Sequence, residues 1–154
     1  MRQATLIAIC IIALYSCKKD APDAGNYIPD YNDLTGTWIM TSFKDNATGA
    51  ISPRPANLPS YYNDPYITLV VKDSNHVDFP DGSSLWNWMG DGDLLIYHDK
   101  TLKFLKCAIT MAGEPDWGLR FMAQLPRTNR YFFTDINHLC FVTSSDTTLN
   151  FKRK

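Results

Sequence analysis

The chain has 154 residues, 45% of them apolar and 20% charged, with a formal net charge of −1 at pH 7. This length suits one domain with a sizeable core, and the near balance of charge gives no reason to expect nucleic-acid binding. Glu114 is the one glutamate among 16 acidic residues, and the aspartates that make up the rest favour turns and strand ends, so the composition favours β-structure.

The first 16 residues have the pattern of an export signal. Arg2 is followed by the apolar run "ATLIAICIIALYS", which is too short to cross a bilayer core that needs about 20 residues. The run passes directly into Cys17 and the charged Lys18. This border resembles the lipobox of bacterial lipoproteins, in which the cysteine sulfur receives a diacylglycerol and the signal is cut just before it. The resemblance implies a signal peptide over residues 1–16 and a Cys17 lipid anchor in the outer membrane of a Gram-negative envelope, on its periplasmic or its surface face.

Residues 17–33 are expected to form a flexible tether, because "KKDAPDAGNYIPDYND" is rich in Asp, Pro, Gly and Asn and has little to bury. A folded domain is then expected over residues 34–154. Its short β-branched and aromatic segments, separated by turn residues, favour an antiparallel meander barrel of about eight strands. The predicted strands are residues 36–43, 66–72, 75–79, 84–89, 93–97, 101–109, 129–134, 138–143 and 147–152.

Turn chemistry and alternation refine this mainly β prediction. Asp81-Gly82 and the stretch 91–93, "DGD", are expected to be hairpin turns, since they supply the positive φ that tight turns need. Trp86 and Trp88 are expected to share one strand face. Another shared face is expected for Leu105, Cys107, Ile109 and Met111.

One segment has a helical rather than a strand period. In "GEPDWGLRFMAQLP" the apolar residues Trp117, Phe121 and Leu125 fall four apart. Pro115 suits a first helical turn and Pro126 ends the run. The pattern predicts a single amphipathic helix of about ten residues that covers one mouth of the barrel or one sheet.

Two stretches resemble known families. "LTGTW" at residues 34–38 resembles the G-x-W signature of lipocalins, in which the tryptophan closes the barrel floor. The chain from Gly92 onward resembles the META domain of bacterial envelope lipoproteins. The matching positions are Thr110-Met111-Ala112, Glu114 with Phe121 and Leu125, Arg130-Tyr131, Leu139, and Leu149 with Phe151. Gly113 departs from that family, which usually has a cysteine there. The resemblance implies a small lipocalin-like barrel with one helix and no established catalytic residues.

Two cysteines remain after Cys10 leaves with the signal and Cys17 takes the lipid. A Cys107–Cys140 disulfide is one prediction, since exported compartments permit disulfides. Two buried, unpaired thiols are the other. The sequence does not decide between them, because it cannot place the two Cα atoms within bonding reach.

The strongest candidate binding segment is residues 44–65, a stretch of about twenty residues with four prolines and no period. Arg54, Tyr61 and Tyr62 in it are residue types favoured at recognition surfaces, and Trp86 and Trp88 are expected nearby. The alternative is that the segment folds across the barrel mouth as a cover.

No motif of catalysis or metal binding stands out. His76, His98 and His138 lie more than twenty residues apart without metal-ligand spacing, and the nucleophile and phosphate-loop patterns are missing. We therefore expect no catalytic residues, no metal and no cofactor. Two functions remain ahead of a hydrolase: an envelope lipoprotein that binds a partner or a small apolar ligand, and a structural or stress-protective module with a filled barrel. A monomer is expected in both cases.

Overall fold

A computed structural model of the chain describes residues 34–58, 66–72, 77–97, 99–110 and 113–154, with the backbone alone described at 77–81, 91, 106 and 107. The predicted signal peptide, Cys17 and the tether lie outside the described residues, as do Tyr61, Tyr62, His76 and His98. In the part of the chain that is described, no helix combines the length and apolarity that crossing a bilayer requires.

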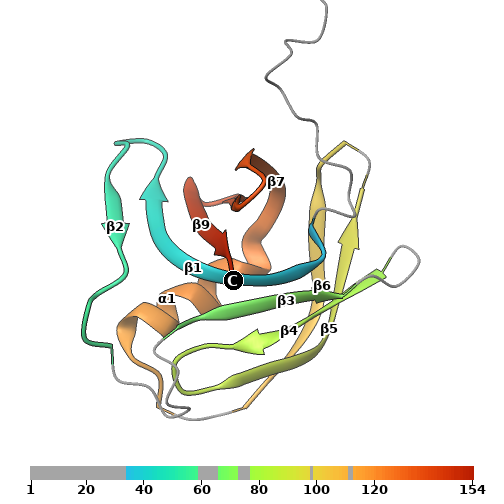
Figure 1. The fold of residues 1–154 in the computed structure, drawn as a ribbon, viewed down its shortest axis with the longest axis horizontal. Coiled ribbons are helices and arrows are strands. Elements are labelled where there is room, and N and C mark those ends of the chain that lie inside the picture. The colour runs from blue at the N-terminus through green and yellow to red at the C-terminus, as the bar shows by residue number, and fades with distance from the viewer. Residues whose placement is uncertain (1–33, 59–65, 73–76, 98, 111–112) are drawn as a thin grey trace, which may run out of the picture.

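Within the described ranges, nine strands form a single antiparallel sheet (Figure 1). They are β1 (Gly36–Asp45), β2 (Ile51–Pro53), β3 (Thr68–Lys72), β4 (Val77–Ser83), β5 (Trp88–Ile96), β6 (Leu102–Ile109), β7 (Thr128–Asp135), β8 (His138–Thr143) and β9 (Thr147–Arg153). The sheet order is β6-β5-β4-β3-β1-β9-β8-β7, with β2 paired to the C-terminal part of β1, at residues 42–44. Two meanders therefore meet where β1 pairs with β9, and the predicted mainly β meander is confirmed.

The predicted closure into a barrel is not complete. Among the described residues, β6 and β7 are joined by an isolated bridge between Thr101 and Arg130 and by a 3.0 Å hydrogen bond from Tyr131 N to Lys100 O. No continuous ladder is described between these two strands. The chain between them forms a helix and a 3-10 turn, and the turn packs beside β6. The result is a curled sheet with a seam between β6 and β7.

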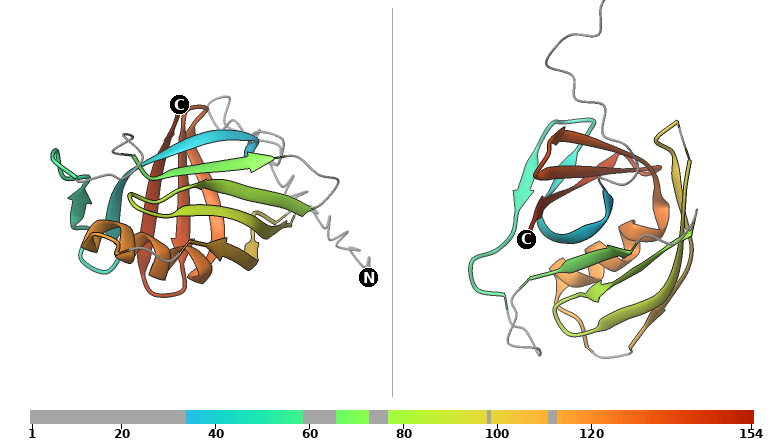
Figure 2. Two further views of the ribbon diagram at one scale, coloured as in Figure 1. Left: turned by 90° about the horizontal axis from the view of Figure 1, so that it is seen from below. Right: turned by 45° about the vertical axis from the view of Figure 1, so that its right-hand side comes forward.

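The predicted helix is confirmed as α1 (Asp116–Gln124), followed by the 3-10 turn η2 (Leu125–Arg127). Pro115 occupies the N-cap, and Trp117, Phe121 and Leu125 are all buried as their spacing predicts. α1 lies across one end of the curled sheet (Figure 2). Its apolar stripe therefore closes that end of the core.

Aromatic rings fill the inner side of the sheet. Phe141 of β8 lies 6.1 Å from Phe104 and 5.2 Å from Phe151, centroid to centroid, and Phe121 of α1 lies 6.4 Å from Phe151. Burying each of these side chains stabilises the folded state by roughly 1.5–3 kcal/mol relative to leaving it exposed. These contacts tie β6, β8, β9 and α1 into one core.

Trp38 of the "LTGTW" stretch seals the core at the start of β1. Its side chain is fully buried, and Nε1 donates a 2.7 Å hydrogen bond to Leu34 O. The Arg153 guanidinium lies 4.5 Å above the indole ring, within cation–π range. The first and last strands are thereby fastened together.

Both predicted glycine hairpins are wrong, because these glycines lie inside strands. Gly82 pairs with Leu69 within the β3–β4 ladder, and a Cβ at Gly82 would lie 2.1 Å from Thr68 O. Glycine is thus required there for close strand approach rather than for a turn. Gly92 lies where the β5–β6 register shifts between Gly90 and Asp93, a β-bulge.

A second register shift explains another wrong prediction. The pairing passes from Asp93 with Lys106 to Leu94 with Phe104, so Leu105 is the extra residue on β6. Phe104 points inward and Leu105 is half exposed. The face predicted for Leu105 is therefore incorrect, although Ile109 does pack against the core.

Candidate functional site

Among the residues that the structure describes, the side chain that accepts the most hydrogen bonds is Glu114, at the turn between β4 and β5, residues 84–87. The Glu114 carboxylate, just before α1, accepts hydrogen bonds from Ser84 Oγ at 2.9 Å and from Asn87 Nδ2 at 2.5 Å. It also accepts from the backbone N–H groups of Leu85 at 2.9 Å and Trp86 at 3.1 Å. Four donors therefore converge on one carboxylate, which binds the turn to the start of the helix.

Burial makes this arrangement strong. Ser84, Leu85 and Asn87 are almost fully buried, so their polar groups depend on partners within the protein. Hydrogen bonds to a charged acceptor are roughly twice as strong as neutral ones. Because four donors occupy its two oxygens, the Glu114 carboxylate serves to hold the turn.

Gly118 makes room for the carboxylate. A Cβ at this position would lie 1.7 Å from Glu114 Oε1. Glycine in a helix interior ordinarily costs about 1 kcal/mol relative to alanine. Glycine at position 118 therefore weakens the helix but leaves room for the Glu114 carboxylate.

The turn presents the two candidate tryptophans differently. Trp86 lies in the turn and packs partly against the core, whereas Trp88 begins β5 with 43% of its surface exposed. Trp88 N donates to Thr110 Oγ1 at 2.9 Å, and the Trp88 ring lies over Gly90, where a Cβ would clash with it. The prediction that they share one strand face is wrong, because Trp86 belongs to the turn and not to a strand.

The predicted loop 44–65 contains more structure than expected. β2 pairs with β1 between Ser42 and Pro53, and Arg54 N donates to Thr41 O at 2.9 Å. The Arg54 guanidinium lies 4.7 Å above the Tyr66 ring. Arg54 is thus fixed near the start of β3. Trp86 and Trp88 are instead positioned by the β4–β5 turn, which Glu114 binds to the start of α1.

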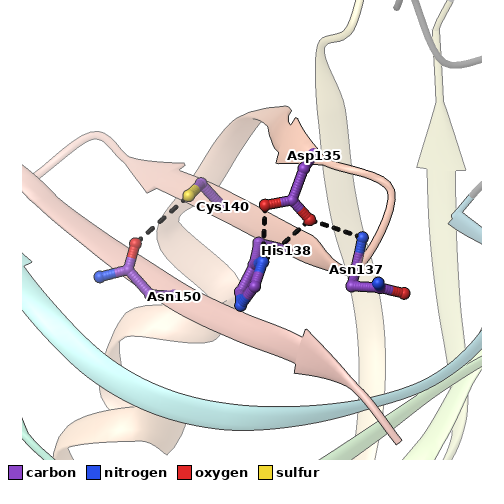
Figure 3. Close-up of polar contacts among 5 residues, drawn as sticks. All are labelled: Asp135, Asn137, His138, Cys140 and Asn150. Carbon is purple, nitrogen blue, oxygen red and sulfur yellow. Dashed lines mark hydrogen bonds and ion pairs between the residues drawn. The ribbon is translucent and has the colours of Figure 1, made fainter.

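A second polar group lies on the outer side of β7–β9 (Figure 3). The Asp135 carboxylate pairs with His138 Nδ1 at 2.7 Å and accepts from Asn137 N at 2.8 Å, which closes the β7–β8 turn. The pKa of Asp135 is lowered, first by the Asn137 N–H and next by His138. Both side chains of the pair are more than half exposed. They form a hairpin-end contact of modest strength.

Cys140 lies two residues after His138 on β8, and its thiol is engaged by the neighbouring strand. Its Sγ donates to Asn150 Oδ1 at 3.2 Å, across β8 and β9 (Figure 3). Burial raises the pKa of the thiol to about 11. A thiol that remains protonated at neutral pH is a poor nucleophile.

The structure shows Cys140 as a free, buried thiol. The Cys107–Cys140 disulfide is therefore not formed, and the alternative prediction of a buried thiol describes Cys140. The Cys107 side chain lies outside what is described. Among the residues with described side chains, no three of His, Cys, Asp or Glu are grouped so that they could hold a metal ion.

Sequence reasoning did not predict the role of Glu114 at the turn. Two signals were available: it is the one glutamate of the chain, and the META-like pattern has an acidic residue at the start of its helix. Its partners lie 27 to 30 residues away in the chain, and no local pattern links them. The turn itself was predicted as part of a strand.

The fold and this site define a mainly β domain with an antiparallel sheet and one described helix, and two solved structures share its fold. An NMR structure of a protein from Burkholderia xenovorans has a TM-score of 0.55 and 22% identity, over 87% of this chain and 97% of that one. A crystal structure of a DUF4847 family protein from Bacteroides vulgatus has a TM-score of 0.51 and 14% identity, over 79% and 94%. No protein-family model and no curated protein matches the chain. At these identities the likeness concerns the fold alone.

Proposed function

We propose that the protein is a non-catalytic lipoprotein of the Gram-negative cell envelope, anchored to the outer membrane through Cys17. It binds a partner, or a small apolar ligand, at a surface formed by the turn at residues 84–87, the adjoining Trp88 and the segment 44–65. The observation that carries this proposal is the exposed Trp88 at the start of β5, directly after a turn that four hydrogen bonds to Glu114 hold in place.

The filled inner side of the sheet favours binding on the outside. Aromatic rings from β6, β8, β9 and α1 contact one another there. A ligand between them would have to displace close-packed side chains, which costs more than binding an already exposed ring.

Trp88 has the properties of a binding anchor. Tryptophan is enriched among residues that dominate binding energy, and a preorganised side chain loses less entropy on binding. The contact with Gly90 and the Thr110 hydrogen bond hold Trp88 before a partner arrives. Arg54 over Tyr66 supplies a second fixed aromatic and cationic feature, just before β3.

Site-specific photo-crosslinking in the native bacterium tests the binding surface. A photoreactive amino acid replaces Trp88 in the full chain, and a matched control places it at Ile136, which is also exposed but lies on the β7–β8 turn. We expect an adduct of discrete mass from position 88 and not from position 136. The partner, once purified, should bind the Trp88→Ala protein at least about tenfold more weakly. Equal adducts from both positions would refute the proposed surface.

Detergent phase partitioning tests the anchor separately. Several acyl chains on one protein hold it firmly in a membrane, at about 0.8 kcal/mol per buried methylene. We expect Cys17→Ala to move the protein from the detergent phase to the aqueous phase. Unchanged partitioning would refute lipidation of Cys17.

The same filled interior also favours a second function, a structural or stress-protective module without a ligand. The two functions differ in what a Trp88→Ala substitution does. If the module acts through its fold alone, this variant protects cells as well as the wild type does, and no crosslinked partner forms. Loss of function in a folded Trp88→Ala protein favours partner binding.

A further inference from the structure

The two halves of the domain carry opposite charge. Residues 34–99 contain three basic and eight acidic side chains, and residues 100–154 contain nine basic and four acidic ones. The net charges are therefore −5 and +5, although the domain as a whole is neutral. The second half forms β6 to β9, and β6 and β7 are the two end strands of the sheet order, so this positive half supplies both strands that border the seam.

The seam between β6 and β7 concentrates part of this charge. Thr101 bridges to Arg130, and the antiparallel direction brings Lys103, two residues along β6, towards Arg127 before β7. η2, which ends at Arg127, packs beside β6. Lys103, Arg127 and Arg130 are exposed, and the side chains described by the structure offer them no ion pair.

Large apolar side chains flank these cations. Tyr97 is 48% exposed at the end of the β5–β6 hairpin, Leu105 is 50% exposed on β6, and Phe132 is 40% exposed on β7. Leu105 is the extra residue of the β6 bulge, next to the buried Phe104. We name the whole set the seam surface: Tyr97, Lys103, Leu105, Arg127, Arg130 and Phe132.

We propose that the seam surface docks on an anionic lipid bilayer and so orients the domain against the membrane. Exposed basic residues interleaved with apolar ones suit this partner, because the cations contact headgroups while the apolar side chains enter the interface. The inference rests on the proposed function, since the lipid anchor supplies the nearby membrane. A second copy of the chain, docked through its acidic half, is the main competing occupant.

Two observations favour a membrane over a second copy. The apolar side chains at the seam lie beside the cations, and a protein partner selected by charge alone would not require them. The acid described at the seam, Asp99, already accepts hydrogen bonds from Thr101 N and Oγ1 at 3.0 and 2.6 Å. It therefore faces the hairpin backbone and leaves the three cations uncompensated.

Vesicle sedimentation tests the docking without the anchor. The chain from residue 17 onward, with Cys17→Ala, is mixed with vesicles of phosphatidylcholine alone or with about three parts in ten phosphatidylglycerol. We expect binding to the anionic vesicles that weakens as salt is raised, since screening shortens the reach of exposed charges. Each basic side chain near an anionic surface contributes about fivefold to the partition coefficient.

Two matched pairs of substitutions make the outcome decisive. Lys103→Gln with Arg130→Gln should lower binding about 25-fold. Lys44→Gln with Lys152→Gln makes the same charge change at exposed positions of β1 and β9, which lie in the middle of the strand order and away from the seam, and should change binding less than twofold. Circular dichroism confirms folding, and Lys103→Gln with Arg127→Gln repeats the test without altering the bridged residue. Leu105→Ser should weaken binding without changing its salt dependence.

Three results would overturn the proposal. They are equal binding to neutral and anionic vesicles, equal loss in the two pairs, and self-association that the seam pair abolishes while vesicle binding is absent. The last result would assign the surface to a second copy. The tested chain has no lipid, so these results do not depend on whether Cys17 is acylated. Acylation is measured separately, by the detergent partitioning of the wild type.

Discussion

Replacing Glu114 with alanine should destabilise the domain more than any other exposed or half-exposed substitution considered above. The variant leaves four donors at the 84–87 turn without their acceptor, and three of them belong to buried residues. Removing one partner from a buried hydrogen bond costs about 1–3 kcal/mol for each group left unsatisfied. Partial opening of the turn lets water replace some of these bonds. We therefore expect the free energy of unfolding to fall by about 3 kcal/mol.

Urea denaturation of the unlipidated chain, followed by tryptophan fluorescence, measures this loss. Asp116→Asn is the control, because Asp116 is an exposed carboxylate two residues further on, and its loss should cost about 0.5 kcal/mol. A loss below about 1 kcal/mol for Glu114→Ala would show that the network does not hold the turn.

Gly118 provides an independent check on the same contact. Gly118→Ala in the wild type should destabilise, because the new Cβ displaces the Glu114 carboxylate from a position 1.7 Å away. In the Glu114→Ala background the same change should stabilise by about 1 kcal/mol, the ordinary gain for alanine in a helix. The reversal of sign is the coupling between the two residues. Equal effects in both backgrounds would refute the contact.

Three further outcomes follow from single sites. The Cys140 thiol, whose pKa burial raises to about 11, should resist alkylation at pH 8 until the protein is unfolded, and rapid labelling of folded protein would contradict this. The Asn137 N–H is the first cause of the lowered pKa of Asp135, so the ionised carboxylate stabilises the fold. The thermal midpoint of the wild type should therefore be higher than that of Asp135→Asn near neutral pH. This advantage should vanish as pH falls through the folded-state pKa, and a constant gap across a pH series would oppose the reasoning. Gly82→Ala should cost about 2 kcal/mol in urea denaturation because its Cβ meets a backbone carbonyl oxygen of β3, whereas Gly113→Ala, with open space around it, should not.

Much of the fold could be predicted from local pattern. The strands from residue 101 onward and the helix around Trp117 and Phe121 lie close to their predicted bounds, since their apolar periods match the elements they form. Leu149 and Phe151 alternate on β9 and are both buried. These elements need no information beyond their own residues.

The errors arose where a distant segment decides the local structure. Gly82 resembles a turn residue, but the backbone of β3 passes too close for any side chain. Leu105 has the spacing to share a face with Ile109, but Leu105 is the extra residue at a register shift and is half exposed, whereas Ile109 packs against the core. The single chain carries no local signal for either contact, so these positions could be assigned only with the sheet assembled.

Trp88 and Arg54 are candidates from the sequence alone, and their role in binding stays a prediction. The structure shows Trp88 exposed and Arg54 placed over Tyr66, and the residue that holds the turn before Trp88 was missed. Glu114 acts across nearly thirty residues, through backbone N–H groups that no side-chain motif records. A sole glutamate is a weak signal until its partners are seen.

The most direct measurement is the mass of the N-terminal peptide of the protein purified from its own bacterium. Acylation of Cys17 at the mature N-terminus would place the domain at the membrane, beside the headgroups that the seam surface is proposed to contact. We expect a peptide that begins at Cys17 and carries diacylglycerol on sulfur. A peptide with a bare Cys17, or one that still contains residues 1–16, would contradict the proposed anchor.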